Sequence, residues 1–229
     1  MGGLVNVLAI ETATPVCALG LSLESGVTLS WVLDEDRRHT EVLAPGIERV
    51  LREFSLRARD LDRIVVDRGP GLFTGLRVGL ATALALGAAS GVEVVGVTSL
   101  EVLADGARRA GARGEVLVAL DGRRGEVFYQ SFALDESTSS ALNEPAVARP
   151  EEVVEHCRRG GAPQWLTGDG VVRYRDVFAR LEGVEIDPQT IPSLDAALEL
   201  GARRTPTPVT PLYLRDADAV ARFTTREGA

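Results

Sequence analysis

Leu8-Ala9-Ile10-Glu11 is an apolar run that ends in an acid, and the same order of residue types returns as Val118-Ala119-Leu120-Asp121. Each run predicts a buried strand that ends at the acid. A strand, a glycine turn and a helix follow one another at 63–75, and these three features return near 164–172. The two halves share almost no identical residues, so the repeat lies in the order of their elements.

Hydrophobic periodicity on either side of these runs predicts the remaining elements. Strands are predicted at 4–10, 15–23, 27–33, 63–66, 93–97, 115–120, 126–134 and 164–167. Helices are predicted at 40–54, 75–89, 99–109, 150–158, 172–181, 194–203 and 216–223. A short third strand is also expected in the second half, after the Ser/Thr-rich loop at 135–140. Each half then begins with three strands, a helix, a strand and a helix in that order.

Two such units predict an α/β protein with the two-lobed actin-like ATPase fold, a duplicated ribonuclease H-like β-β-β-α-β-α unit. In this fold, nucleotide lies between the lobes. We expect an N-terminal lobe at 1–105, completed by the C-terminal segment 206–224, and a C-terminal lobe at 106–205.

The loops that hold phosphate in this fold correspond to Glu11-Thr12-Ala13-Thr14 and to the segment that begins Asp121-Gly122-Arg123. The first loop lacks the glycine that would let a phosphate approach the backbone closely. The two acids would either flank Mg²⁺ or serve as capping or solvated groups at strand ends. We therefore predict a degenerate nucleotide site, whose vestigial residues are Glu11, Thr12, Asp121, Gly168 and Gly170.

The composition excludes several reaction classes. The chain has 229 residues and a formal net charge of −8, and all 25 of its basic residues are arginine. Without lysine there is no P-loop and no Schiff-base chemistry, including that of lysine-anchored PLP enzymes. The acidic balance also argues against broad binding of a phosphate backbone as the main task.

The most distinctive segment is Gly69-Pro70-Gly71-Leu72-Phe73-Thr74-Gly75-Leu76-Arg77-Val78-Gly79. Its glycines and proline predict a tight turn, and Thr74 is the expected N-cap of the helix that follows. Phosphate binding at this helix start is disfavoured, because Pro70 donates no N–H and no lysine is available.

The helix after this turn is apolar on every side, so every side must be covered. Gly75, Gly79, Ala83 and Gly87 recur at intervals of four, which gives a face almost without side chains. Either the chain itself covers this helix, or another protein docks on it, and we favour docking. The predicted partner interface consists of Leu72, Phe73, Gly75, Leu76, Gly79, Leu80, Ala83, Leu84, Gly87 and Val50.

Metal, nucleophile and targeting signals are missing. His39 and His156 are far apart in sequence, and no HxxxH, HExxH or Gly-x-Ser-x-Gly pattern occurs, so we expect no metal, no cofactor and no catalytic residue. Cys17 and Cys157 have no CxxC spacing, as is typical of a reduced cytoplasmic protein. We expect no signal peptide, and the charge-free stretch 78–92 is shorter than the roughly 20 residues that a membrane span needs.

Six blocks together resemble the TsaB (YeaZ) family. They are Leu8–Thr14, Arg38-His39-Thr40, Gly69–Gly79, Asp121-Gly122-Arg123-Arg124-Gly125-Glu126-Val127-Phe128, Gly168-Asp169-Gly170 and Pro211-Leu212-Tyr213-Leu214-Arg215. The resemblance covers nearly the whole chain. The family motif residues lie in the second and third of these six blocks. They are Arg38, His39, Thr40, Gly69, Pro70, Gly71, Thr74 and Arg77.

The resemblance implies a dimerisation subunit of the bacterial machinery that forms N6-threonylcarbamoyladenosine at position 37 of tRNA. Such a subunit would bind the TsaD-type catalytic subunit through helices of its N-terminal lobe, here the helix after Gly71 and the helix at 40–54. A TsaE-type ATPase would join, and contact with tRNA would be indirect. Glu11 departs from the aspartate of many members, which weakens a claim of tight Mg–nucleotide binding.

The leading hypothesis is therefore a non-catalytic, cytoplasmic scaffold subunit that lies outside the membrane. The rival is an ATP-dependent phosphotransferase of the same fold, whose Asp-x-Gly-Thr loop Glu11–Thr14 does not supply. A metallohydrolase is disfavoured by the histidines. We also expect a homodimer in isolation. Any positive charge offered to tRNA or to a partner carboxylate must come from arginine, for example from the adjacent pairs Arg37-Arg38 and Arg123-Arg124.

Overall fold

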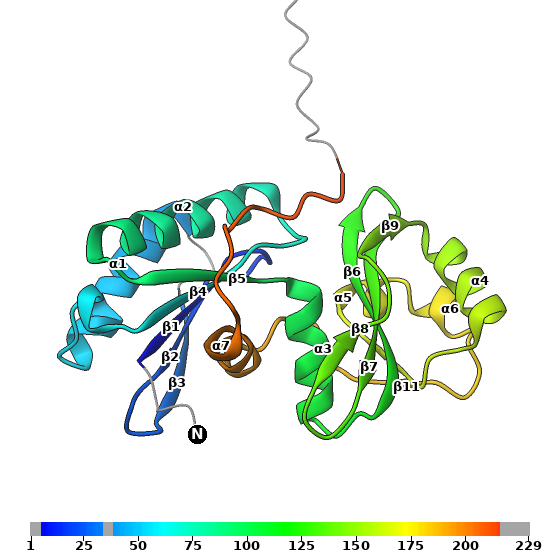
Figure 1. Cartoon of the computed structure of the whole chain (residues 1–229). Helices are drawn as coiled ribbons and strands as arrows, with labels where there is room; N and C mark the ends of the chain where they lie inside the picture. The colour runs from blue at the N-terminus through cyan, green and yellow to red at the C-terminus, as the bar shows by residue number, and fades with distance from the viewer. Residues whose placement is uncertain (1–5, 34–38, 216–229) are drawn as a thin grey trace, which may run out of the picture.

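The computed structural model describes residues 6–33 and 39–215, which form two α/β lobes lying side by side (Figure 1). The sheet of the first lobe has the strand order β3-β2-β1-β4-β5. Its strands are β1 (Val7–Glu11), β2 (Ala18–Ser22), β3 (Thr28–Val32), β4 (Arg63–Asp67) and β5 (Glu93–Val97). β2 is antiparallel to β1 and β3, whereas β1, β4 and β5 are parallel.

The sheet of the second lobe repeats this arrangement, because its order β8-β7-β6-β10-β11 matches that of the first sheet strand for strand. β6 is antiparallel to β7 and parallel to β10, and a further strand, β9, pairs with β7. The strands are β6 (Gly114–Arg123), β7 (Glu126–Leu134), β8 (Ser139–Ala141), β9 (Ala146–Ala148), β10 (Trp165–Thr167) and β11 (Glu185–Ile186). The predicted duplication is confirmed, and the chain has the two-lobed actin-like ATPase fold.

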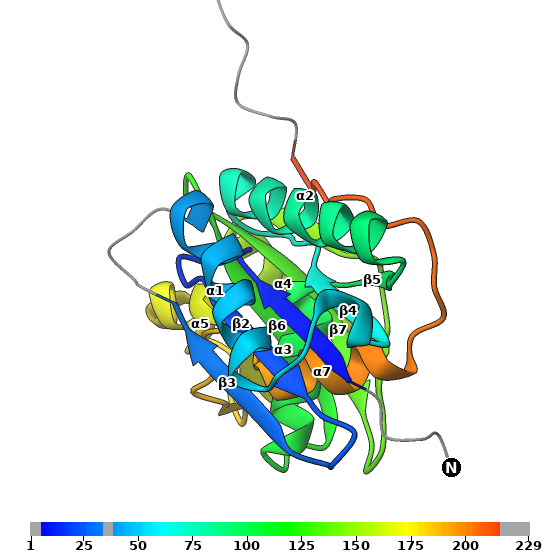
Figure 2. The ribbon, with the colours of Figure 1, turned by 90° about the vertical axis from the view of Figure 1, so that its left-hand side faces the viewer.

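Helices cover both faces of each sheet (Figures 1 and 2). α1 and α2 lie on one face of the first sheet and α7 on the other, while α3 and the α4–α6 group enclose the second sheet. The helices are α1 (His39–Glu53), the short 3₁₀ helix η1 (Ala58–Asp60), α2 (Phe73–Ser90), α3 (Ser99–Arg109), α4 (Pro150–Gly160), α5 (Asp169–Arg173), α6 (Arg175–Phe178) and α7 (Leu194–Arg203).

Two helix predictions were wrong in detail. α2 begins at Phe73 with Leu72 at the cap position, so Thr74 lies inside the first turn instead of capping it. The helix expected at 172–181 is two short helices, α5 and α6, separated by Tyr174, whose φ of −109° and ψ of 36° are not helical. The helix expected at 216–223 lies outside the described residues.

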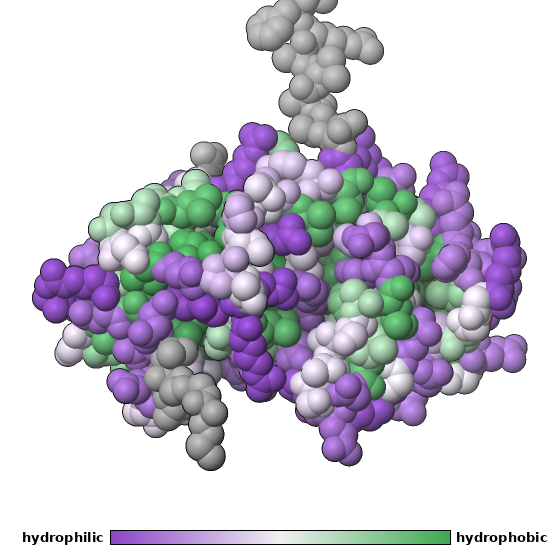
Figure 3. Space-filling model, viewed as in Figure 1, coloured by the Kyte–Doolittle hydropathy of each residue, from purple (hydrophilic) through white to green (hydrophobic). Residues whose placement is uncertain are grey.

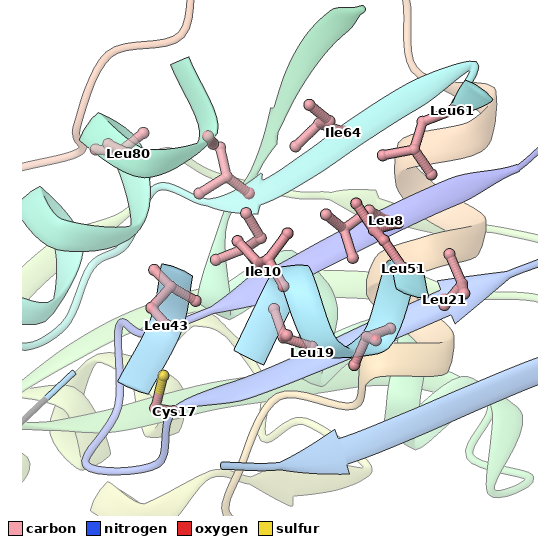
Figure 4. Packing of buried hydrophobic residues seen from close by; sticks show 14 residues of the cluster. Leu8, Ile10, Cys17, Leu19, Leu21, Leu43, Leu51, Leu61, Ile64 and Leu80 are labelled. Atoms are coloured by element: carbon pink, nitrogen blue, oxygen red, sulfur yellow. The ribbon is translucent and has the colours of Figure 1, made fainter. Parts of the chain in front are cut away.

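The core of the first lobe lies between its sheet and helices α1 and α2 (Figure 4). Leu8 and Ile10 of β1 point toward Leu43 and Leu51 of α1, and all four side chains are buried. Full burial of one such side chain contributes about 1.5–3 kcal/mol. This packing fixes β1, whose last residue leads into the space between the lobes.

α7 comes from the second half of the sequence but packs on the first sheet. Ala196, Ala197 and Leu198 contact strand residues such as Val7 and Val65. Gly201 permits this approach, since a Cβ there would lie 2.1 Å from Cγ2 of Val65. Arg63 Nη1 satisfies the helix end by donating to the carbonyl oxygens of Gly201, Ala202 and Arg204, each at 2.9 Å.

The division of the chain into lobes at 1–105 and 106–205 stays a prediction. α7 lies within 106–205 in sequence and on the first sheet in space, so the boundary between the lobes does not follow the order of the chain. Of the segment 206–224, the structure describes 206–215, which runs from the first lobe to the second.

Candidate functional site

A pocket of about 330 Å³ lies between the lobes, where the loops that follow β1 and β4 face the tip of the β6–β7 hairpin. Four successive residues of the C-terminal segment, 212–215, also line it. The first lobe contributes Ala13, Thr14, Pro15, Pro70, Gly71, Leu72, Phe73 and Leu76, and the second contributes Leu120, Asp121, Gly122, Arg123, Arg124, Phe128 and Asp169. Most of these walls are apolar.

The first-lobe wall is held by contacts between the loop after β1 and the start of α2. Leu72 N donates to the carbonyl oxygen of Ala13 at 2.7 Å, and Thr12 Oγ1 donates to that of Gly75 at 2.9 Å. A Cβ on Gly75 would lie 2.0 Å from the carbonyl oxygen of Thr12, and one on Gly71 would lie 2.2 Å from that of Ala13. The glycines therefore let α2 approach its own chain.

This packing corrects the predicted partner interface. Seven of its ten residues are buried beneath their own chain: Val50, Gly75, Leu76, Gly79, Leu80, Ala83 and Gly87. The reason is that the glycine row faces the loop after β1 and the first sheet. Phe73 and Leu84 are exposed, and Leu72 is half-buried. The chain itself therefore covers the glycine face of α2, whereas docking of another protein on the outward face stays a prediction.

The outward face of α2 carries mostly small apolar side chains, and hydrophobic surface is visible over this helix in Figure 3. Between α2 and α1 it forms a groove of about 1050 Å³, which we call the helix groove. Its apolar lining consists of Ala44, Ile47, Leu51, Leu56, Ala58, Ala81, Ala85, Leu86 and Ala89. Glu48, Arg52 and Arg57 stand at its polar side.

Glu11 and Asp67 form a buried carboxyl pair behind the pocket. They are 3% and 2% exposed, respectively. Asp67 Oδ1 accepts hydrogen bonds from Gly69 N at 2.7 Å and Ser99 Oγ at 2.9 Å, while Oδ2 has no hydrogen-bond partner among the described residues. Burial and the Asp67 carboxylate raise the pKa of Glu11 well above 4.5. Burial also raises the pKa of Asp67, so the fold disfavours two charges at this site.

This pair gives a pH dependence to stability. A carboxyl whose pKa is raised on folding stabilises the fold fully below its unfolded pKa, and this contribution falls as pH rises toward the folded pKa. We expect Glu11→Gln, which keeps the size of the side chain and removes its titration, to flatten the decline in unfolding free energy between about pH 5 and 8. Urea unfolding of the wild type and of Glu11→Gln across that pH range measures the free energy of unfolding of each. Parallel pH profiles would contradict the raised pKa of Glu11.

The second-lobe wall carries the other predicted acid. Asp121 lines the pocket, and its Oδ2 lies 3.3 Å from Nη1 of Arg123 and 3.5 Å from Nε of Arg173. Asp169 accepts a hydrogen bond from Asp121 N at 2.9 Å, and burial raises the pKa of Asp169. Two arginines therefore already neutralise the carboxylate that would have faced Mg²⁺.

The five predicted vestigial nucleotide residues do not form one site. Asp121 alone among them lines the pocket. Glu11 and Thr12 are buried behind the first-lobe wall. Gly168 and Gly170 pack against β6. A Cβ on Gly168 would lie 2.3 Å from the carbonyl oxygen of Ala119, and a Cβ on Gly170 would lie 2.8 Å from it. The wall thus lacks two unpaired carboxylates that could hold a metal–nucleotide.

The remaining family motif residues are placed as follows. His39 Nε2 lies 3.2 Å from the carbonyl oxygen of Pro15, so it supports the loop after β1. Gly69 has φ +97° and is joined to Pro70 by a cis peptide bond, which forms the turn before α2. Thr40, Thr74 and Arg77 are exposed. Arg38 lies outside the described residues.

Sequence reasoning missed the C-terminal strap, residues 209–215, as part of the site. Leu212 N donates to the carbonyl oxygen of Arg68 in the first lobe at 2.7 Å. Arg215 donates to the carbonyl oxygen of Gly122 at 3.1 Å and pairs with Glu126 in the second. The block 211–215 was noticed in the sequence, but its hydrogen bonds join residues far apart in the chain, and no local pattern encodes them.

Within residues 6–33 and 39–215, no three His, Cys, Asp or Glu side chains gather in an arrangement that could hold a metal ion. α2 meets the length and composition of a membrane span, and among the described helices it is the one that does. It packs along the first sheet with its glycine row buried, as a helix of a globular core does.

Comparisons with known proteins agree on one group. A family model described as "TsaD: tRNA N6-adenosine threonylcarbamoyltransferase" matches residues 34–175. The chain is 32% identical to the tRNA threonylcarbamoyladenosine biosynthesis protein TsaB of Escherichia coli (strain K12) over 163 residues, which are 71% of this chain and 70% of that protein.

Two solved structures extend the similarity to the whole fold. YeaZ from Pseudomonas aeruginosa is 28% identical, with a TM-score of 0.73 over 85% of this chain and 90% of that one. A second P. aeruginosa protein, described as similar to peptidase YeaZ, is 27% identical, with a TM-score of 0.78 over 92% of this chain and 100% of that one.

Proposed function

Because the chain belongs to the TsaB (YeaZ) family, whose named members serve the biosynthesis of threonylcarbamoyladenosine in tRNA, we propose that it is a scaffold subunit of the complex that makes this modification at position 37. In this role it binds and activates a TsaD-type transferase subunit and has no active site of its own.

The helix groove carries this proposal. It is apolar, it is lined by two long helices, and its floor of alanines lets a partner helix approach closely. Groups that bury such a surface gain roughly 25 cal/mol for each Å² removed from water. A monomer leaves it in contact with solvent, so a helical partner is the occupant that fits.

The identity of the partner is supported by the similarity of the two subunits. The family model described as TsaD matches residues 34–175 of this chain, a range that includes α1 and α2. A transferase with the same helix pair would meet the helix groove with its own pair, in a pseudo-twofold arrangement related to that of homodimers. By the same reasoning, the chain pairs with its own copy in isolation.

The interlobe pocket supports a role without catalysis. Arginines neutralise Asp121, and Glu11 is buried behind the pocket wall, so the rival ATP-dependent phosphotransferase would lack a pair of accessible, unpaired carboxylates for its metal. We further propose that the protein works in the cytoplasm, that a TsaE-type ATPase joins the assembly, and that the transferase subunit makes the main contact with tRNA.

Reconstitution tests the proposal. We expect the purified chain and its cognate TsaD-type subunit to elute together in size-exclusion chromatography, and tRNA modification to depend on both. Calorimetry with Mg–ATP on the chain alone should give no micromolar binding. Separate elution of the two subunits, or full modification without this chain, would contradict the scaffold role, and micromolar ATP binding would restore the phosphotransferase.

A further inference from the structure

Two aromatic side chains stack on each other at the rim of the interlobe pocket. Phe73, at the start of α2, and Tyr213, in the C-terminal strap, have ring centroids 5.2 Å apart and a tilt of 34°. They are 37% and 41% exposed, and no other Phe, Trp or Tyr side chain in the described part of the chain is as accessible. The two rings in contact form an apolar platform at the mouth of the pocket, with one polar hydroxyl at its edge.

A guanidinium group extends this stack. Cζ of Arg77 lies 3.8 Å from the centroid of the Phe73 ring, and Nε of Arg77 donates to the Tyr213 hydroxyl at 3.2 Å. The contact orients both rings while leaving them exposed. Planar aromatic and guanidinium groups held in this way are the surfaces on which unpaired nucleic acid bases stack.

Across the pocket, Arg123 and Arg124 lie at the tip of the β6–β7 hairpin. Both have left-handed backbones, with φ of 62° and 55°. A left-handed conformation is unfavourable for a non-glycine residue, and such strain gathers at functional sites. Arg215 holds the tip in place through the carbonyl oxygen of Gly122 and through Glu126. The hairpin tip therefore places Arg123 and Arg124 on the wall of the pocket.

The surroundings of the pocket differ in charge from the chain as a whole. The chain carries a net charge of −8, yet arginines outnumber carboxylates at the wall of this pocket, apart from the buried Glu11–Asp67 pair behind it. The arginines are Arg77, Arg123, Arg124, Arg173 and Arg215, and the carboxylates are Asp121, Glu126 and Asp169. If Arg123 turns toward a phosphate, Arg173 remains beside Asp121. The local balance thus favours an anion, although the whole chain does not.

We propose that the rim of the interlobe pocket binds an unpaired RNA nucleotide, with its base stacked on Tyr213 and Phe73 and its phosphate at Arg123 and Arg124. The identity of the RNA, a tRNA loop, rests on the proposed function. Three sequence blocks that lie far apart in the chain, at 69–79, 121–128 and 211–215, meet at this rim. The scaffold role explains none of the exposed groups that they place there.

The test measures binding of a fluorescently labelled anticodon stem-loop RNA, both to the chain alone and to its complex with the TsaD-type subunit. We expect Tyr213→Ala to weaken binding about tenfold, because stacking on one aromatic side chain contributes that much per base. Tyr213→Phe keeps the ring and should bind like the wild type. Ile191→Ala removes a comparably exposed apolar side chain away from the pocket and serves as the control.

The phosphate contact has its own readout. Log affinity falls as log salt concentration rises, and the double variant Arg123→Gln, Arg124→Gln should make this slope shallower by about two. Each lost phosphate contact reduces the steepness of the slope by about one. Arg175→Gln, an exposed arginine on α6, should leave the slope unchanged. Ultraviolet cross-linking should attach the loop nucleotide to Tyr213 or Phe73.

Several outcomes would overturn the nucleotide site. Equal binding by wild type and Tyr213→Ala would do so, as would equal affinity for a fully paired RNA of the same length. Loss of the TsaD-type subunit from Tyr213→Ala would make the stack a protein contact. Tighter binding of AMP than of the stem-loop would make the pocket a free-nucleotide site. If the chain alone binds the stem-loop through Tyr213 but no TsaD-type subunit, the scaffold role fails and the nucleotide site stands.

Discussion

Ala85→Arg in the helix groove is expected to abolish binding of the TsaD-type subunit while the chain stays folded. Ala85 is exposed, so in the free chain the new guanidinium group reaches solvent. In a complex it would be buried in an apolar contact without a partner, which costs several kcal/mol and weakens binding by a factor of about a hundred or more. Calorimetric titration measures the loss, and tRNA modification by the mixture should fall with it.

The control for this variant is Ala179→Arg, which adds the same side chain at an exposed position on the second lobe. It should bind the partner as the wild type does, and thermal unfolding should show that both variants keep the stability of the parent. An unchanged dissociation constant for Ala85→Arg would place the partner elsewhere. It would leave the family membership intact and remove the helix groove from the proposal.

Gly75→Ala is expected to destabilise the chain strongly although alanine favours helix. The gain in helix propensity is at most about 1 kcal/mol. Against it, the new Cβ would lie 2.0 Å from the carbonyl oxygen of Thr12, so α2 or the loop after β1 must move. We expect a net loss of about 3 kcal/mol and a melting temperature lower by about 6–12 °C.

Gly160→Ala is the matched control, because Gly160 ends α4 and a Cβ there would have no neighbour within 4 Å. It should change the free energy of unfolding by less than about 1 kcal/mol, in either direction. Differential scanning calorimetry of the two variants makes the comparison. Equal melting temperatures would mean that the contact between α2 and the loop after β1 relaxes at little cost.

The fold could be predicted because its signals are local. The apolar runs Leu8–Glu11 and Val118–Asp121 predict buried strands from only a few residues. The helical periodicity at 40–54 and 194–203 predicts helices with a buried face from only a few turns. These local patterns do not say against which other strand or helix of the chain each buried face packs. The periodicity of 194–203 predicts one apolar face, but nothing in it says that this face packs on the first sheet.

The candidate site was harder to predict because it depends on orientation. The glycine row of α2 was recognised, but α2 is apolar on both sides, so its sequence could not show that the glycines face inward. The contact of Tyr213 with Phe73 joins segments that are far apart in sequence, and neither segment has a period that points to the other. Only the three-dimensional arrangement brings the arginines of the hairpin beside them.

The return of α7 to the first sheet has a consequence for synthesis on the ribosome. β5 ends at Val97, but the helix that covers the second face of its sheet ends at Arg203. At a translation rate of about 5–20 residues per second, that apolar face waits on the order of ten seconds for its cover. The nascent protein is therefore most open to aggregation, and most in need of a chaperone, midway through its translation.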